Sequence, residues 1–399
     1  MKAQTTPRSA SAKSRQKGEP AAYRRIVVKA GTTLLTHGGD RLNLQVMATL
    51  VEQMAQLRSS GTETILVSSG AVAAGRHALG VSSEGRNVPY RQVLAAAGQG
   101  RLMHAYEQLF DWHQVPVAQA LLTRSDFSER LGYLNIRNTL LSLLELKVIP
   151  IVNENDVVAV EELAGEAFGD NDSLSALVAN LVDADLLVML GEMEGLFTAD
   201  PHDDPGARLI QTVDHLDGEV QAIGGASWGN KGRGGMTTKI EAARLATASG
   251  GDVVIASGLE RDVLPRLARR ERIGTFFPAS RTRMESRKRW VLTGLSSAGE
   301  IVVDDGAARA LFHHNRSLLP TGVKQVQGHF ERGEIVSIVD SRGGRLAAGI
   351  TNYSSDDLAK IGGAHSRLIE EILGHQYGDE AVHRNNMVIL QENPDADRH

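Results

Sequence analysis

The chain has 399 residues, enough for one large or two moderate domains, each with a hydrophobic core. It is 42% hydrophobic and 23% charged, and its net charge of −5 argues against a whole-molecule role in coating nucleic acid or a membrane surface. It has no cysteine, which excludes disulfides, thiolate metal sites and cysteine nucleophiles, and no apolar run long enough to cross a membrane. We therefore expect a cytoplasmic protein.

Strand-like and helix-like segments alternate along residues 25–278. Short apolar runs predict strands, and apolar residues three or four positions apart predict helices. The expected strands are 25–29, 64–67, 115–122, 148–152, 185–190 and 252–256. The expected helices are 44–57, 71–79, 91–112, 140–144, 174–181 and 236–248. This alternation predicts an α/β fold whose mostly parallel sheet is sandwiched by helices.

The pattern changes after residue 278. Residues 279–288 are charged and lack periodicity, so we predict a linker, followed by a small β-rich domain over 289–375. Its expected strands are 290–294, 300–303, 323–329 and 334–339. Residues 1–24 are expected to form a disordered tail, since they are polar and lack the apolar core of a secretory signal. Residues 376–399 are expected to form a second tail, of which 387–390 could dock.

Polar side chains gather where the predicted strand 148–152 ends. Asn153–Asp156 follow it directly, and Gly169–Asp172 open the helix expected to run from residue 174. Ligands of α/β proteins bind beyond the carboxyl ends of the strands, so both clusters should line one crevice. Two acidic clusters in one crevice need cations, and Lys29 and Lys239 are the candidates.

Three other turns lead from strands into helices at the same predicted sheet edge. Gly232–Lys239 is glycine-rich and ends in a lysine, but it lacks Walker A spacing. Glycines let backbone N–H groups approach phosphate oxygens, and a helix N-terminus adds partial positive charge. Lys29 ends the first strand, and Ser68–Ala71 ends the second. Each alone is more typical of a mobile loop, a solvated lysine or a helix cap, but together they favour an anion site.

This set of residues suits phosphoryl transfer, in which positioning and charge stabilisation dominate catalysis. Two lysines could hold the transferring group, and Asp170 or Asp172 could fix their ammonium groups. No general base is needed if the acceptor is already an ionised carboxylate.

The chain resembles the amino acid kinase family over roughly residues 25–375. The motifs that carry the resemblance are Val27–Thr32, Val67–Gly75, Val152–Asp156, Gly169–Ala176, Gly195–Pro201 and Gly234–Lys239. The C-terminal part is similar to a PUA domain, through Gly299–Gly306, Ser317–Val323 and Gly328–Gly333. The match is closest to family members that phosphorylate the γ-carboxylate of L-glutamate, in the first step of proline biosynthesis.

The resemblance implies that ATP, with Mg2+, is the phosphoryl donor. Lys29 and Lys239 would contact the phosphoryl group, with Asp170 organising them. Glutamate would be held by Ser69, Asp156 and Asn171, with help from Asn153 and Asp172. The nucleotide would lie on the loop formed by Arg233, Gly234, Gly235, Met236, Thr237, Thr238 and Lys239. No metal ligand is assigned. The family also implies feedback inhibition by proline at or near the glutamate site, and a dimer or tetramer.

The chain departs from the family at two places. Gly191 and Glu192 stand where Thr-Asp is frequent, so the carry-over of nucleotide contacts stays open there. Arg233 stands where Thr is common.

Two other interpretations remain open. Chemistry alone does not separate glutamate from aspartate or N-acetylglutamate, because each offers a carboxylate acceptor. The chain could instead be an RNA-binding protein, since Arg287–Trp290 is basic and aromatic, although the acidic net charge disfavours this.

Overall fold

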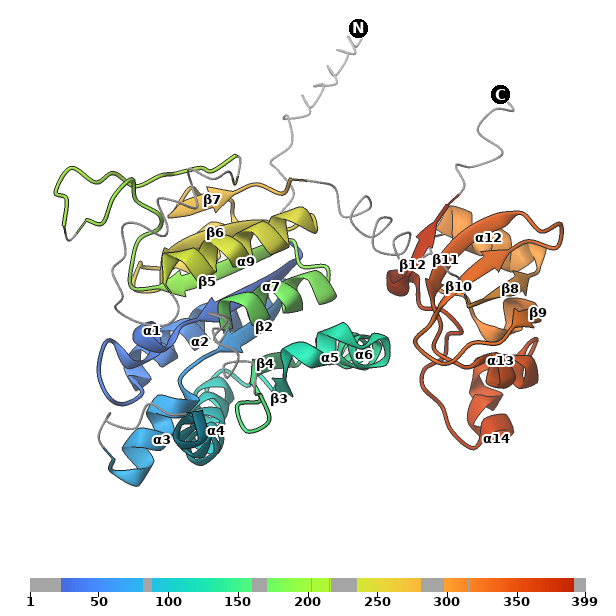
Figure 1. Ribbon diagram of the computed structural model, residues 1–399, viewed down its shortest axis with the longest axis horizontal. Helices are drawn as coiled ribbons and strands as arrows, with labels where there is room; N and C mark the ends of the chain where they lie inside the picture. Colours follow the sequence, from blue (N-terminus) through green and yellow to red (C-terminus); the bar gives the residue numbers. More distant parts are fainter. Residues whose placement is uncertain are drawn as a thin grey trace, which may run out of the picture.

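The computed structural model describes residues 23–81, 88–159, 171–201, 203–214, 216, 235–280, 298–314 and 316–390. A large sheet with helices on both faces is followed by a smaller sheet with short helices (Figure 1). None of the helices within these ranges is long and apolar enough to span a membrane.

The large sheet has seven strands in the order β3-β4-β2-β1-β5-β6-β7. The strands are β1 (Arg25–Ala30), β2 (Glu63–Ser68), β3 (Val117–Leu122), β4 (Ile149–Glu154), β5 (Leu186–Gly191), β6 (Asp252–Ser257) and β7 (Thr275–Phe277). All neighbours are parallel except β7, which pairs antiparallel with β6. The predicted mostly parallel α/β sheet is confirmed. β7 was not predicted, because three residues are too short to show a periodicity.

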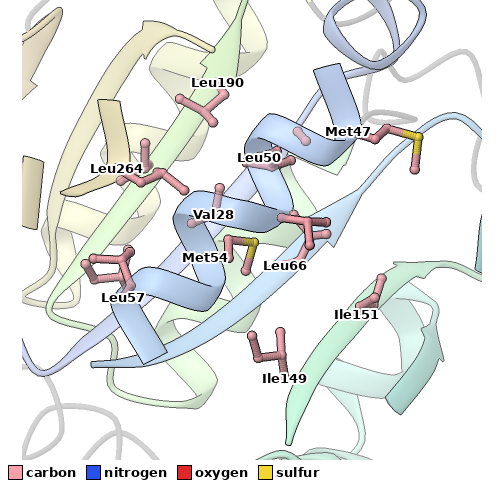
Figure 2. Close-up of a cluster of buried hydrophobic side chains, with 14 of the residues drawn as sticks. Val28, Met47, Leu50, Met54, Leu57, Leu66, Ile149, Ile151, Leu190 and Leu264 are labelled. Carbon is pink, nitrogen blue, oxygen red and sulfur yellow. The ribbon is translucent and has the colours of Figure 1, made fainter. Parts of the chain in front are cut away.

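Helices cover both faces of this sheet, as the apolar spacing predicts. They are α1 (Thr32–Thr36), α2 (Leu44–Ser59), α3 (Ala71–Leu79), α4 (Val88–Asp111), α5 (Arg124–Ser128), α6 (Arg130–Glu145), α7 (Asn171–Leu181), α9 (Met236–Ala248) and α10 (Val263–Ala268). Alternate side chains of the central strands enter opposite cores, which is the period of a β-strand. Val28 packs with residues of α2 and α10, whereas Val27 packs with residues of α6, α7 and α9. Figure 2 shows part of the first core, with Met47, Leu50 and Met54 of α2 above the sheet.

Two glycines allow helices α3 and α4 to touch backbone to backbone. A Cβ on Gly75 would lie 1.8 Å from the carbonyl oxygen of Leu94, and one on Gly98 would lie 1.9 Å from that of Ala71. No side chain fits at such distances, because the obstructing atoms are backbone and cannot move aside. The crossing therefore fixes α4 close to the turn at which α3 begins.

We expect Gly98→Ala to destabilise the protein, because the added methyl group forces the two helices apart. Overpacking of this kind costs about 1–3 kcal/mol, occasionally more. The control is Gly100→Ala on the same helix, where an added Cβ meets nothing within 4 Å. Alanine should stabilise the helix there by about 0.5–1 kcal/mol. Urea unfolding measures both changes, and equal effects of the two substitutions would contradict the close crossing.

The C-terminal sheet has five strands in the order β12-β11-β10-β8-β9. They are β8 (Gly299–Val303), β9 (Val323–Gly328), β10 (Ile335–Val339), β11 (Arg345–Ile350) and β12 (Met387–Ile389). Helices α12 (Asp305–His314), α13 (Ser355–Ile361) and α14 (Ile369–Leu373) accompany it. The sheet continues beyond residue 375, because β12 pairs antiparallel with β11 and buries Met387 and Val388. Residues 387–389 thus dock onto the sheet, as expected for part of 387–390. The expected strand 290–294 lies outside the described residues.

Helix α6 contacts this second sheet. Leu134 is fully buried in a cluster with Ile335, Ile350 and Val388, and Arg332 donates a hydrogen bond to Asn135 at 2.7 Å. The C-terminal domain therefore packs against the helix that leads into β4.

Candidate functional site

The site lies at the carboxyl ends of the central strands. β1 lies between β2 and β5, with Lys29 level with Val67 on one side and Met189 on the other. The Lys29 side chain is only 2% exposed. A buried lysine needs a partner, because an unpaired charge in the interior is costly.

That partner is Asp172, the second residue of α7. One carboxylate oxygen lies 2.6 Å from Nζ of Lys29, and the other lies 3.0 Å from Nζ of Lys239. Asp172 is completely buried, so solvent screens these interactions little. The one carboxylate thus bridges two ammonium groups and holds them side by side. Two ammonium groups placed in this way can contact the oxygens of an anion.

Lys239 reaches this point from the first turn of α9. The helix begins at Met236 after the extended residue Gly235, and the Thr238 hydroxyl donates to Asp172 at 2.8 Å. Met236 is 5% exposed and packs in the core, so its backbone N–H is the part available to a ligand. Free N–H groups and the helix dipole at this end favour a negatively charged ligand.

A cluster of amides and hydroxyls lies next to the ion pairs. Asn171 donates through Nδ2 to the Ser68 carbonyl oxygen and the Ser69 hydroxyl, both at 2.8 Å, and to Oδ1 of Asn153 at 3.0 Å. Asn171 Oδ1 is buried and has no hydrogen-bond partner among the described residues. An acceptor without a partner in a buried place suits a ligand that brings a donor. Asp156 lies half-buried in the turn after β4, three residues beyond Asn153.

Several predicted residues are brought together and others are not described. Lys29, Lys239 and Asp172 converge, as do Ser69, Asn153 and Asn171. Asp170, Arg233 and Gly234 lie outside the described residues, as does the basic stretch Arg287–Trp290. Among the described residues, Asp172 lies between the two lysines, and it is one of the two predicted candidates. The role of Asp170 as their organiser stays a prediction, because this residue is not described.

Helix α4 contributes two residues that the sequence reasoning missed. Gln99 accepts a hydrogen bond from Asn153 Nδ2 at 2.7 Å, and the Tyr106 hydroxyl lies 2.9 Å from the Ser68 hydroxyl. Burial raises the pKa of Tyr106 far above its ordinary range, so the phenol stays protonated. Both residues belong to the helix expected over 91–112, and the signal that could have found them is their seven-residue spacing beside the tightly packed Gly98.

No group of three or more histidine, aspartate or glutamate side chains with the arrangement of a metal site is found in the ranges described. Both carboxylate oxygens of Asp172 form ion pairs with the two lysines. Mg2+ usually binds through substrate phosphates and one or two carboxylates, keeping several waters, so this donor set fits a metal that arrives with a nucleotide.

Comparison with known proteins gives two family matches. The amino acid kinase family matches residues 24–257, and the PUA domain matches residues 299–373. The chain is 52% identical over 368 residues to the glutamate 5-kinase of Dehalococcoides mccartyi (strain CBDB1), covering 92% of this chain and 99% of the relative. It is 51% identical to the glutamate 5-kinase of Herpetosiphon aurantiacus, with the same two coverages. It is 47% identical to that of Deinococcus radiodurans, covering 92% of this chain and 100% of the relative.

Among solved structures, a UMP kinase from Bacillus anthracis aligns with 65% of this chain and 98% of its own. The TM-score is 0.46 and the sequence identity 15%.

Proposed function

The chain belongs to the amino acid kinase family, and from this we propose that it transfers the γ-phosphoryl group of ATP to the γ-carboxylate of L-glutamate. The products are L-glutamyl 5-phosphate and ADP. The observation that carries the proposal is the convergence of Lys29 and Lys239 on the buried carboxylate of Asp172. The near-full-length identity to glutamate 5-kinases supports glutamate over aspartate or N-acetylglutamate.

The reaction forms a bond between a γ-carboxylate oxygen and phosphorus, and breaks the bond between phosphorus and the bridging oxygen of ADP. The acceptor is ionised at neutral pH, since a glutamate carboxyl group has a pKa near 4.3, and no general base is required. Lys29 and Lys239 hold the oxygens of the transferring group, where negative charge is concentrated. Asp172 fixes the two ammonium groups before substrate arrives, so little reorganisation is needed during transfer.

The nucleotide lies along Gly235–Lys239, where the backbone N–H groups at the start of α9 meet its phosphates. Arg233 and Gly234 belong to the same proposed contact. Mg2+ would arrive with ATP and would neutralise charge on its phosphates.

Glutamate is held by Ser69, Asn153, Asp156 and Asn171. The unsatisfied Oδ1 of Asn171 suits the α-ammonium group of an amino acid, because that group brings three donors. We propose that proline, the end product of the pathway that this reaction opens, inhibits at or near the same amide cluster. A cytoplasmic location, a dimeric or tetrameric assembly and RNA binding by the PUA domain stay predictions.

The test is an acyl phosphate trap. With ATP, Mg2+, hydroxylamine and L-glutamate, the purified chain should produce γ-glutamyl hydroxamate together with ADP, because hydroxylamine attacks the acyl phosphate. L-Aspartate and N-acetylglutamate, each offered as the sole acceptor, should give little product. Hydroxamate from aspartate or N-acetylglutamate alone would assign the chain to another acceptor. Tight, salt-sensitive RNA binding without any hydroxamate would favour the RNA-binding alternative.

A further inference from the structure

One face of α4 lies behind the amide cluster. Gln99 and Tyr106 are seven residues apart, which is two helical turns, so both side chains leave the helix on the same side. The buried residues between and beside them are Ala95, Gly98, Leu102 and Phe110. Tyr106 is buried and Gln99 is half-buried on this otherwise apolar face, and each has a defined partner at the site.

The donor and the acceptor of each hydrogen bond in the cluster can be assigned in turn, beginning at the backbone carbonyl oxygen of Ser68. The Ser68 oxygen can only accept, so Asn171 must turn its Nδ2 group toward it. Asn153 must then offer Oδ1 to Asn171, and the same oxygen accepts from the backbone N–H of Glu154 at 2.9 Å. The Nδ2 group of Asn153 therefore points to Gln99, whose Oε1 is the last acceptor in this series of hydrogen bonds.

The same reasoning identifies the donor in the hydrogen bond between Tyr106 and Ser68. The Ser68 hydroxyl donates to the Ser69 carbonyl oxygen at 2.9 Å, which uses its one hydrogen. The Tyr106 phenol must therefore donate to Ser68. Tyr106 therefore holds Ser68, whose carbonyl oxygen orients Asn171. Gln99 is the acceptor at the other end of this series of hydrogen bonds.

We propose that Gln99 is a positioning residue for glutamate, which acts by holding Asn153 in the orientation that leaves Asn171 Oδ1 free to accept from the substrate. The proposal rests on the function proposed above. Asn153 is 3% exposed, so without Gln99 its Nδ2 group loses its acceptor in a place that water barely reaches. Rotating the amide by half a turn would not help, because its nitrogen would then face the Nδ2 group of Asn171 and the N–H of Glu154.

Substituting Gln99 should weaken the binding of glutamate and leave the binding of the nucleotide unchanged. Asn153 and Asn171 belong to the amide cluster, whereas Lys29, Asp172 and Lys239 are tied together by their own ion pairs. Gln99→Leu, which removes the acceptor and leaves an aliphatic side chain, should raise KM for glutamate roughly ten- to a hundredfold. The values of kcat and of KM for ATP should stay within roughly threefold of the wild type.

The experiment measures KM for glutamate, KM for ATP, kcat and the thermal midpoint in three variants. Gln99→Glu keeps an acceptor oxygen and should recover most of the glutamate affinity lost in Gln99→Leu. Gln108→Leu makes the same substitution at an exposed position of α4 and should match the wild type in all four quantities.

A wild-type KM for glutamate in Gln99→Leu would overturn the proposal. Equal impairment of Gln99→Leu and Gln99→Glu, or a joint change of both KM values with a lowered thermal midpoint, would also overturn it and leave a structural role only. The wild type serves as the internal reference: if it forms hydroxamate from glutamate while Gln99→Leu is normal, only the role of Gln99 fails. If the wild type forms none, the proposed function fails, and this role with it.

Discussion

Replacing Lys239 with alanine is expected to lower kcat by roughly a thousandfold while the protein stays folded. Removing one preorganised group that stabilises transition-state charge typically costs about 10²–10³ in rate, and cationic groups at a transferring phosphoryl group reach about 10³–10⁵. Lys239 lies in the first turn of α9 and pairs with Asp172, and it is not part of the hydrophobic core clusters, so truncation removes a charge and leaves core packing intact. The fold should therefore survive even though turnover does not.

The measurement combines the hydroxamate assay with circular dichroism and a thermal melt. Lys360→Ala, which removes an exposed lysine from α13, is the matched control and should keep full activity. A near-normal kcat in Lys239→Ala would remove this residue from the proposed mechanism. Loss of the folded signal would show that the lysine serves structure instead.

Asp172→Asn is expected to reduce both activity and stability, because it keeps the shape of the side chain but removes its charge. Lys29, 2% exposed, would then be buried beside a neutral amide. Removing one partner of a buried ion pair costs about 3–5 kcal/mol, since the other charge is left uncompensated. The kcat should fall by roughly 10²-fold or more, because the carboxylate charge that bridges the two ammonium groups is lost.

Stability separates this variant from the previous one. Lys239→Ala removes a cation and leaves the Asp172–Lys29 pair intact, whereas Asp172→Asn leaves two cations facing each other. Urea unfolding should therefore show a large loss for Asp172→Asn and a small one for Lys239→Ala. Adding Lys239→Ala to Asp172→Asn should recover part of the loss, since it relieves the repulsion. Additive losses in the double variant would contradict the bridging role of Asp172.

Local patterns were sufficient for most long, buried segments, but they missed β11 (Arg345–Ile350). The continuous apolar run of β1 predicted a strand, which the structure has. The polar residues that end β4 were expected to lie near the start of the helix that follows, and Asn153 is hydrogen-bonded to Asn171. Lys29 was selected because it ends a strand just before Gly31, and Lys239 because it ends a glycine-rich loop that enters a helix. Their side chains do converge. Strand β7 and strand β12 were not predicted, because each is three residues long and is held by its pairing with a neighbouring strand.

The sequence by itself determined the α/β class, the sheet edge where polar residues gather and the two lysines of the site. These follow from hydrophobic periodicity and from residue types at the ends of strands, which are properties of neighbouring positions. Only the tertiary structure decided that Asp172 lies between the lysines and that Gln99 and Tyr106 support the amide cluster. These contacts join residues that are 38 to 143 positions apart in the sequence, and the packing of helices on the sheet sets the distances between them. The contacts are Tyr106–Ser68, Gln99–Asn153, Asp172–Lys239 and Asp172–Lys29.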